Sequence, residues 1–300
     1  MKLSTLALAL AACASPLAST QQAIIGGSAD AGDSAVVMLA AYPADHSTLF
    51  TCTAEVVSPT ALVTAGHCLD HTADYAYGVF YGEDASSYAT LTELLPQLAA
   101  TSATYIYPGY DRSAPFTGDI GVVVLAQATQ VAPLAFARQA PTQAMVGEPA
   151  RIVGYGQTVY NTFHESRDAA DTTVAAIDAG DTITVGDTTH LTCVGDSGGP
   201  ALVSNVIVGV DSYSDTTGCT QPAHFRRTDV YAAFIDQYAG TSAPLGSDAG
   251  PTAGADAGTG SDMETSSSGG GCTSGRTTGS GATILVALCL LRASGRRRRR

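Results

Sequence analysis

Short apolar runs separated by turn residues recur along most of the chain, and they fall into two sets. The first set lies at residues 36–41, 52–57, 61–64, 79–81 and 120–125. The second set lies at 150–155, 172–177, 201–203 and 206–210, after a connection rich in proline and alanine at 132–149. Runs this short, without helical periodicity between them, predict an all-β barrel or sandwich and argue against alternating strands and helices.

Only one stretch has the periodicity of a helix. In residues 229–238, Val230, Ala233, Phe234 and Gln237 recur at helical spacing. The pattern predicts a single helix that follows the last strands.

The stretch 193–200, with the sequence CVGDSGGP, combines a hydroxyl nucleophile, a carboxylate and three glycines. A serine becomes a nucleophile only with a neighbouring base and with N–H groups directed at the developing oxyanion. Glycine tolerates the dihedrals that turn the N–H groups of Gly195 and Ser197 toward one point. The plain structural alternative is a glycine-rich turn before a strand that opens at Pro200.

A base and an acid are available upstream. His67 follows the apolar run 61–63, and Asp119 stands at the start of another such run. With its flanking motifs TAGHC and GDIGVVVL, the order His67, Asp119, Ser197 resembles the chymotrypsin/trypsin-like serine peptidase family over residues 24–238. The resemblance implies two six-stranded antiparallel β-barrels with the active site between them, and a C-terminal α-helix. It also implies that His67 is the general base, that Asp119 orients it and that Ser197 is the nucleophile.

The same resemblance assigns further roles near the nucleophile. The N–H groups of Gly195 and Ser197 form the oxyanion hole, and Asp196 pairs with the α-ammonium that is freed when the chain is cut before Ile24. It implies two disulfides, drawn from Cys52, Cys68, Cys193 and Cys219, one at the histidine turn and one bracing the substrate pocket. The other cysteines, Cys13, Cys272 and Cys289, lie outside the peptidase region.

The resemblance also places the substrate pocket. Leu191 stands six residues before the nucleophile, where tryptic members of the family have an aspartate. Ser212, Ser214 and Ala223 are the other expected wall residues. A pocket with small or apolar walls is expected to prefer small or apolar side chains at the cut site, with modest discrimination.

Composition narrows the possible partners and ligands. Only 14% of the 300 residues are charged, which is typical of an exported protein. Residues 24–240 carry 6 Arg against 23 Asp and Glu, a difference of −17, so nucleic acid is not an expected partner. No C-x-x-C or H-x-x-x-H spacing is present, and we expect neither a metal site nor a cofactor.

The two ends differ from the centre. Residues 1–18 have the charged start and short apolar core of a signal peptide, and 19–23 would be a short propeptide. The motif LAAC that ends at Cys13 also resembles a bacterial lipoprotein box, so lipidation stays an alternative. After the peptidase domain at 24–239, residues 240–271 read as a flexible linker of Gly, Ser, Ala and Asp.

Residues 272–300 combine a cysteine, an apolar run and an arginine cluster, and they resemble the C-terminal sorting signals of myxobacterial surface proteins. This tail predicts membrane association and a location at the cell envelope or surface, or in the medium once the tail is removed. The run of ten apolar residues at 282–291 is short against the roughly 20 needed to span a bilayer.

The sequence therefore predicts an exported, monomeric serine endopeptidase that acts on proteins or peptides through an acyl-enzyme. The alternative is a catalytically silent homologue that serves as a surface binding module. An α/β-hydrolase esterase is excluded, because its order is serine, acid, histidine.

Overall fold

The computed structural model describes residues 24–113, 115–156, 166–216 and 218–239. All described residues belong to one compact unit. The expected signal peptide, propeptide, linker and sorting tail lie outside the described residues. Within the described part, no helix is long and apolar enough to cross a membrane.

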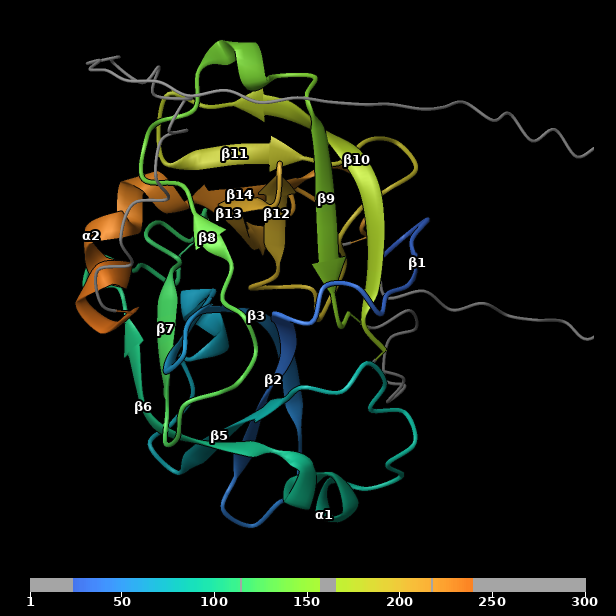
Figure 1. Cartoon of the computed structure of the whole chain (residues 1–300), viewed down its shortest axis with the longest axis vertical. Helices are drawn as coiled ribbons and strands as arrows, with labels where there is room; N and C mark the ends of the chain where they lie inside the picture. Colours follow the sequence, from blue (N-terminus) through green and yellow to red (C-terminus); the bar gives the residue numbers. More distant parts are fainter. Residues whose placement is uncertain (1–23, 114, 157–165, 217, 240–300) are drawn as a thin grey trace, which may run out of the picture. The chain divides into compact units, whose positions relative to one another are not determined.

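Six antiparallel strands close the first barrel in the order β2-β3-β4-β7-β6-β5 (Figure 1). They are β2 (Val36–Pro43), β3 (Phe50–Ser58), β4 (Ala61–Thr64), β5 (Tyr75–Phe80), β6 (Ala99–Ile106) and β7 (Gly121–Leu125). Alternate side chains such as Val37, Leu39 and Leu62 point inward and form one buried cluster. The barrel has no free edge, because β5 returns to pair with β2.

Six further antiparallel strands close the second barrel in the order β9-β10-β11-β14-β13-β12. They are β9 (Pro149–Gly154), β10 (Asp168–Ile177), β11 (Thr182–Val185), β12 (Pro200–Val203), β13 (Val206–Tyr213) and β14 (Ala223–Arg227). Two short strands extend this sheet: β1 (Ser28–Ala29) pairs with β10, and β8 (Ala135–Phe136) lies parallel to β13. The two-barrel, all-β fold expected from the sequence is confirmed.

The C-terminal helix α2 (Thr228–Ala239) is also confirmed, but its buried face differs from the predicted stripe. Tyr231, Phe234 and Ile235 are buried, whereas Val230 is 49% exposed. The helix contacts β13 of the second barrel as well as β4 and β7 of the first. The other helices of the described chain are short: α1 (Leu91–Leu94), η1 (Gly66–Cys68), η2 (Leu95–Gln97) and η3 (Gln143–Met145).

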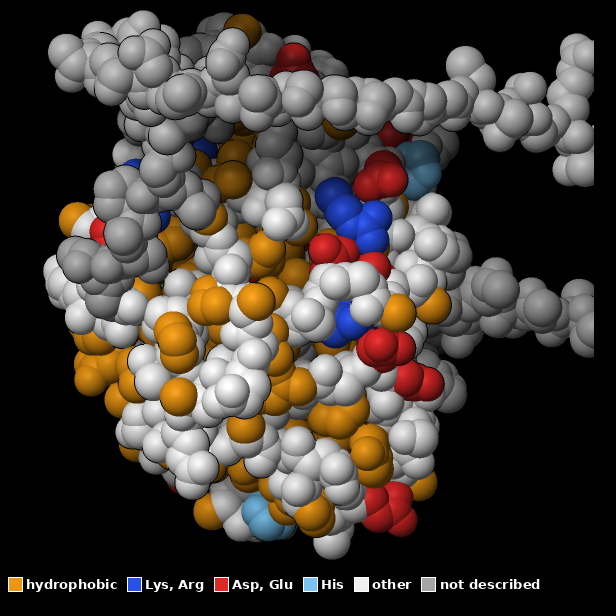
Figure 2. Space-filling model, in the orientation of Figure 1, with side chains coloured by type: hydrophobic (Ala, Val, Ile, Leu, Met, Phe, Trp, Pro, Cys, Tyr) orange, Lys and Arg blue, Asp and Glu red, His pale blue; other side chains and the backbone are white. Residues whose placement is uncertain are grey.

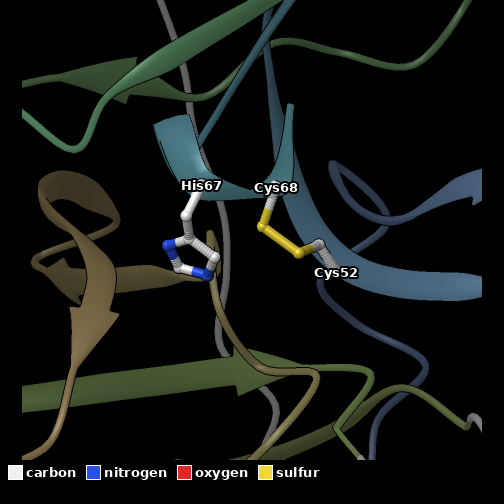
Figure 3. A group of neighbouring side chains, drawn as sticks. All are labelled: Cys52, His67 and Cys68. Atoms are coloured by element: carbon white, nitrogen blue, oxygen red, sulfur yellow. A yellow bond between two sulfur atoms is a disulfide. The ribbon is translucent and has the colours of Figure 1, made fainter. Parts of the chain in front are cut away.

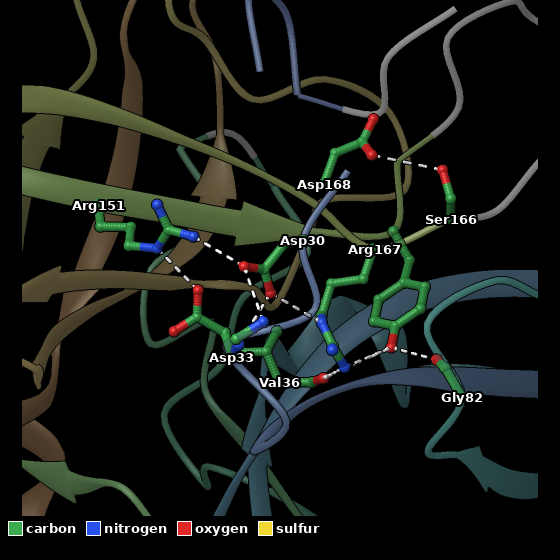
Figure 4. A network of polar contacts seen from close by, with 10 residues as sticks. Asp30, Asp33, Val36, Gly82, Arg151, Ser166, Arg167 and Asp168 are labelled. Atoms are coloured by element: carbon green, nitrogen blue, oxygen red, sulfur yellow. Dashed lines mark hydrogen bonds and ion pairs between the residues drawn. The ribbon is translucent and has the colours of Figure 1, made fainter. Parts of the chain in front are cut away.

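A network of charged side chains ties the N-terminal segment to both barrels (Figure 4). The Arg167 guanidinium is buried and donates to Asp30 Oδ2 at 3.0 Å, to the Val36 carbonyl at 3.2 Å and to the Tyr155 hydroxyl at 3.3 Å. The Tyr155 hydroxyl donates in turn to the Gly82 carbonyl at 2.7 Å. In the second barrel, Tyr155 directly follows β9 and Arg167 directly precedes β10. Val36 begins β2 of the first barrel, so the network spans the boundary between the barrels.

Candidate active site

His67 and Asp119 are brought together by two paired strands. His67 lies in η1, directly after β4, and Asp119 precedes β7. The pairing of Thr64 with Gly121 places the end of β4 beside the start of β7. His67 Nδ1 lies 2.8 Å from Asp119 Oδ2, and the His67 backbone N–H donates to Asp119 Oδ1 at 2.7 Å. Both carboxylate oxygens therefore fix the histidine, one through its ring and one through its backbone.

Ser212 completes the surroundings of Asp119. Its hydroxyl donates to Asp119 Oδ2 at 2.6 Å, and Asp119 itself is fully buried. Burial opposes the charged form of His67, but the hydrogen bond and negative charge of Asp119 act more strongly together and raise the pKa of His67 above 6.5. The pair thus favours a histidine that accepts a proton readily.

Ser197 lies in the turn before β12, next to this pair. Its carbonyl accepts a hydrogen bond from the Thr53 N–H at 2.9 Å, and Cys68 Sγ lies 3.6 Å from the same oxygen. Ser197 and Ser212 line one cleft. Among the described residues no hydrogen bond joins Ser197 to His67, and such contacts are often long before substrate binds.

The expected oxyanion hole has the backbone geometry that glycine permits. Gly195 has a φ of +96°, a region that residues with a Cβ rarely adopt. Its carbonyl accepts a hydrogen bond from Thr53 Oγ1 at 3.2 Å. Neither the Gly195 N–H nor the Ser197 N–H donates to a described residue, so within that part of the chain both are available to a ligand.

Asp196 is fully buried and directly precedes Ser197. Its carboxylate accepts from the Gly156 N–H and the Cys193 N–H, each at 2.8 Å. Burial raises the pKa of Asp196 well above its ordinary value. Ile24 is also fully buried, and Ile25 pairs with Leu191, five residues before Asp196. In the uncut chain Ile24 carries an amide in place of an ammonium, so the buried carboxylate has only neutral donors.

The cleft beside Ser197 has a volume of about 190 Å³. It is lined by Thr192, Cys193, Val194, Ser197, Asp211, Ser212, Tyr213, Ser214, Thr216 and Cys219. Of the expected pocket residues, Ser212 and Ser214 are in this lining. Leu191 and Ala223 are buried and are not part of it.

Asp211 is the residue that the sequence-based pocket missed. It lies in β13 and is almost completely buried, although it lines the cleft. Burial raises the pKa of Asp211 to about 7, while a hydrogen bond from the Thr192 side chain and the charge of His67 act in the opposite direction. The sequence signal was an acid placed directly after the apolar run 206–210, which is unusual in a buried strand.

Both disulfides are present, Cys52–Cys68 and Cys193–Cys219. The first lies beside His67 (Figure 3), and the second borders the cleft. Cys52, His67 and Cys68 offer ligand atoms close enough together for a metal ion. However, the two sulfur atoms are bonded to each other, so the thiolates that zinc requires are not available. Each bridge stabilises the fold by roughly 2–4 kcal/mol in an oxidising compartment.

Two barrels with a histidine–aspartate pair and a serine turn at their junction define the class of chymotrypsin-like folds. The family model for trypsin matches residues 24–235, and the chain belongs to the trypsin family. A trypsin of Saccharopolyspora erythraea is 24% identical over 196 residues, which cover 60% of this chain and 81% of that protein.

Solved structures agree on the fold. The structure of GrC has a TM-score of 0.59 at 20% identity and covers 71% of this chain and 98% of its own. Neuropsin, a serine protease expressed in the limbic system of mouse brain, has a TM-score of 0.55 at 20% identity, with coverage of 70% and 97%. An inactivated protease paralogue of the scabies mite has a TM-score of 0.57 at 18% identity, with coverage of 71% and 97%. At such identities the likeness concerns the fold alone.

Proposed function

We propose that this chain is an exported serine endopeptidase whose catalytic residues are His67, Asp119 and Ser197. The observation that carries the proposal is the fixed His67–Asp119 pair, joined through Ser212 to the cleft that Ser197 lines. All three residue types needed for the reaction are retained, and each lies where the fold brings the two barrels together.

In the proposed reaction Ser197 Oγ attacks the substrate carbonyl carbon while His67 Nε2 takes the hydroxyl proton. Asp119 holds Nδ1 and stabilises the resulting imidazolium. The N–H groups of Gly195 and Ser197 stabilise the oxyanion. His67 then gives its proton to the leaving amine, which breaks the peptide bond and leaves an acyl-enzyme. Water, activated by His67 in the same way, releases the acid and restores Ser197.

Cleavage before Ile24 would supply the ammonium that the buried Asp196 lacks in the uncut chain. The burial of Ile24 and the pairing of Ile25 with Leu191 support this activation step, because they hold the new terminus near the Asp196 turn. Pairing a buried carboxylate with an ammonium removes a cost of several kcal/mol.

The expected preference for small or apolar side chains is not carried into this proposal. It rested on Leu191, Ser212, Ser214 and Ala223. Leu191 and Ala223 lie outside the lining of the cleft, and Ser212 and Ser214 share that lining with the carboxylate of Asp211. Proteins or peptides remain the proposed substrates, and a monomer the proposed form.

The proposal includes a C-terminal sorting signal that directs the protein to the cell envelope. The apolar run and arginine cluster of residues 272–300 would hold the protein at the cell envelope until the tail is removed. A chain that ends at residue 240 is expected to keep full peptidase activity and to move from the envelope fraction to the medium. If the full and shortened chains partition identically between the envelope fraction and the medium, the sorting signal is rejected.

A fluorophosphonate probe tests the catalytic proposal directly, because it reacts only with an activated serine. The processed wild-type protein is expected to be labelled and Ser197→Ala is not. Ser87→Ala is the matched control, because Ser87 is exposed and distant from Ser197 in the sequence. This variant should label like wild type. Absence of labelling in correctly processed wild type would favour the catalytically silent binding module; an inactivated protease paralogue of the scabies mite has a similar fold.

A further inference from the structure

One carboxylate stands in the wall of the cleft beside Ser197. Among the residues that line the cleft, Asp211 is the only one with a carboxyl group. The residue is 4% exposed and receives a hydrogen bond from the side chain of Thr192. Thr192 lines the same cleft, so the remaining access to the Asp211 carboxylate is from the cleft itself.

The described arginines do not neutralise Asp211. Each of the six pairs with a carboxylate other than Asp211, and Figure 2 shows arginine side chains directly beside acidic ones on the face that it draws. The pairs are Arg112–Asp70, Arg138–Asp236, Arg151–Asp30, Arg167–Asp30, Arg226–Asp181 and Arg227–Asp229. The sequence has a single lysine, Lys2, which lies outside the described residues. The cleft therefore contains an acid whose counter-charge is not supplied by a described arginine or lysine.

A comparison with Glu55 shows why the access of a ligand to the carboxylate matters. Glu55 is a second buried acid near Asp211, and its carboxyl oxygens have no hydrogen-bond partner among the described residues. However, Glu55 is completely sealed and is not in the lining of the cleft, so no ligand reaches it. Asp211 differs because a substrate side chain that enters the cleft can approach it.

We propose that Asp211 determines which substrate side chain occupies the cleft, and that it selects the cationic side chains of lysine and arginine. This inference rests on the proposed peptidase function and adds its substrate class. An ammonium or guanidinium provides both the missing counter-charge and hydrogen-bond donors. The hydroxyl oxygens of Ser212, Ser214 and Thr216 can accept the remaining donors. An acidic side chain is repelled, and an apolar one leaves the carboxylate buried and unpaired.

The selection is expected to depend on pH. Because burial raises the pKa of Asp211 to about 7, the carboxylate is partly protonated near neutrality. The titratable groups that act on it are His67 and Asp119 at the catalytic pair, Glu55 in the first barrel and Asp196 directly before the nucleophile. Ionisation of Asp211 as the pH rises strengthens the binding of a cation. Ionisation of His67 changes the rate for all substrates, so it cancels in a ratio of two substrates.

The experiment compares two fluorogenic peptides that differ only in arginine or leucine at the cut site. The enzyme concentration is fixed by active-site titration with a fluorophosphonate. Wild type is expected to show a kcat/KM at least tenfold higher for arginine at pH 8, and this ratio should fall toward pH 6. In Asp211→Asn the ratio is expected to drop at least tenfold and to lose its pH dependence. Asp215→Asn removes an equal charge from a side chain that is 70% exposed, and it should keep the wild-type ratio.

A second measurement uses only the wild-type protein, so it does not depend on whether a variant folds. The aryl amidinium benzamidine is expected to inhibit wild type at least tenfold more strongly than neutral benzamide, and its inhibition constant should fall from pH 6 to pH 8. If titrated enzyme prefers leucine, or if benzamidine and benzamide are equal, the inference about Asp211 is wrong while the peptidase function stands. If the protein is not labelled at all, both proposals fail.

Discussion

Thr53 Oγ1 donates a hydrogen bond to the carbonyl oxygen of Gly195 at 3.2 Å and accepts one from the Tyr155 N–H at 3.0 Å. Thr53 belongs to β3 of the first barrel, whereas Gly195 and Tyr155 belong to the half of the chain that forms the second. One hydroxyl therefore holds the peptide between Gly195 and Asp196, which lies between the two proposed oxyanion-hole N–H groups, and links the two barrels. Arg167 donates to the side-chain hydroxyl of the same Tyr155, so Tyr155 connects the buried network of the N-terminal segment to the turn that contains Ser197.

Thr53→Val is expected to lower kcat by about tenfold or more and to leave KM nearly unchanged. Its physical reason is that the oxyanion contact forms only in the transition state, so misplacing Gly195 affects the chemical step. Thr53→Ser keeps the hydroxyl and should retain most of the rate. Thr228→Val is the matched control, because Thr228 is equally buried and its hydroxyl donates to the Ile207 carbonyl at 2.8 Å. Steady-state kinetics and thermal melts would check this, and equal kcat losses in Thr53→Val and Thr228→Val would refute the positioning role.

The raised pKa of His67 sets the acidic limit of activity. Below its pKa the histidine is protonated and does not act as a base, so kcat/KM for an uncharged substrate should rise with pH through a midpoint above 6.5. Asp119→Asn is expected to lower kcat by about 10⁴-fold, the loss known for this change in a Ser-His-Asp triad. A pH–rate profile measures both effects. A midpoint below 6.5 in wild type would contradict the electrostatic account of the pair.

Glu55 is expected to make the fold less stable as the pH rises. Burial raises the pKa of Glu55 well above 4.5 in the folded state, whereas the unfolded chain ionises near 4.5. Stability from this group is therefore complete below pH 4.5 and is lost as the pH rises toward the folded-state pKa, by about 1.4 kcal/mol per pH unit. Glu55→Gln has no proton to lose, so it should unfold at a higher temperature than wild type at pH 7 and at nearly the same temperature at pH 4.

Glu148→Gln is the control for that experiment, because Glu148 is exposed. It should leave the pH dependence of the melting temperature unchanged. If Glu55→Gln and wild type differ by the same amount at pH 4 and pH 7, Glu55 does not titrate in the way that its burial requires.

The Arg167–Asp30 pair is expected to matter for stability far more than an exposed pair. Arg167 is 1% exposed, and removing it leaves the buried Asp30 with only Arg151 as a cationic partner and takes away the donor to the Val36 carbonyl. Arg167→Met is expected to cost about 3–5 kcal/mol of unfolding free energy. Arg112→Met breaks an exposed pair with Asp70 and should cost no more than about 1 kcal/mol. Chemical denaturation of the two variants measures the difference, and similar losses would show that the buried network is not a structural link.

The apolar pattern predicted an all-β barrel or sandwich, because most of the strands are short runs of valine, leucine and isoleucine, and the family resemblance added the two six-stranded barrels. The pattern missed three strands of the barrels, β6, β11 and β14. The reasons for β6 and β14 differ. β6 is built largely from alanine and threonine, so its apolar alternation is weak. β14 contains Arg226, which is buried only because Asp181 and the carbonyls of Pro115 and Phe116 receive its guanidinium. Partners so distant in sequence are not visible in a local pattern.

The candidate site shows the same limit. The residues expected at His67, Asp119 and Ser197 could be found because their motifs are contiguous in sequence. The wall of the cleft depends on how β13 turns its side chains, and a loop of uncertain length precedes Ala223. That is why Asp211 was missed and why Ala223 was expected in the lining, whereas Leu191 was expected there from its position six residues before Ser197.

The pairing of every described arginine also bears on self-digestion. If the protein is a peptidase whose cleft accepts lysine and arginine, its own folded domain offers that cleft few places to cut. A peptide bond must leave its strand or turn to enter the cleft, and an arginine held by a carboxylate must first leave that partner. Arg112, with a side chain 70% exposed, is the weakest point of this protection and the first bond at which autolysis of the folded domain would begin.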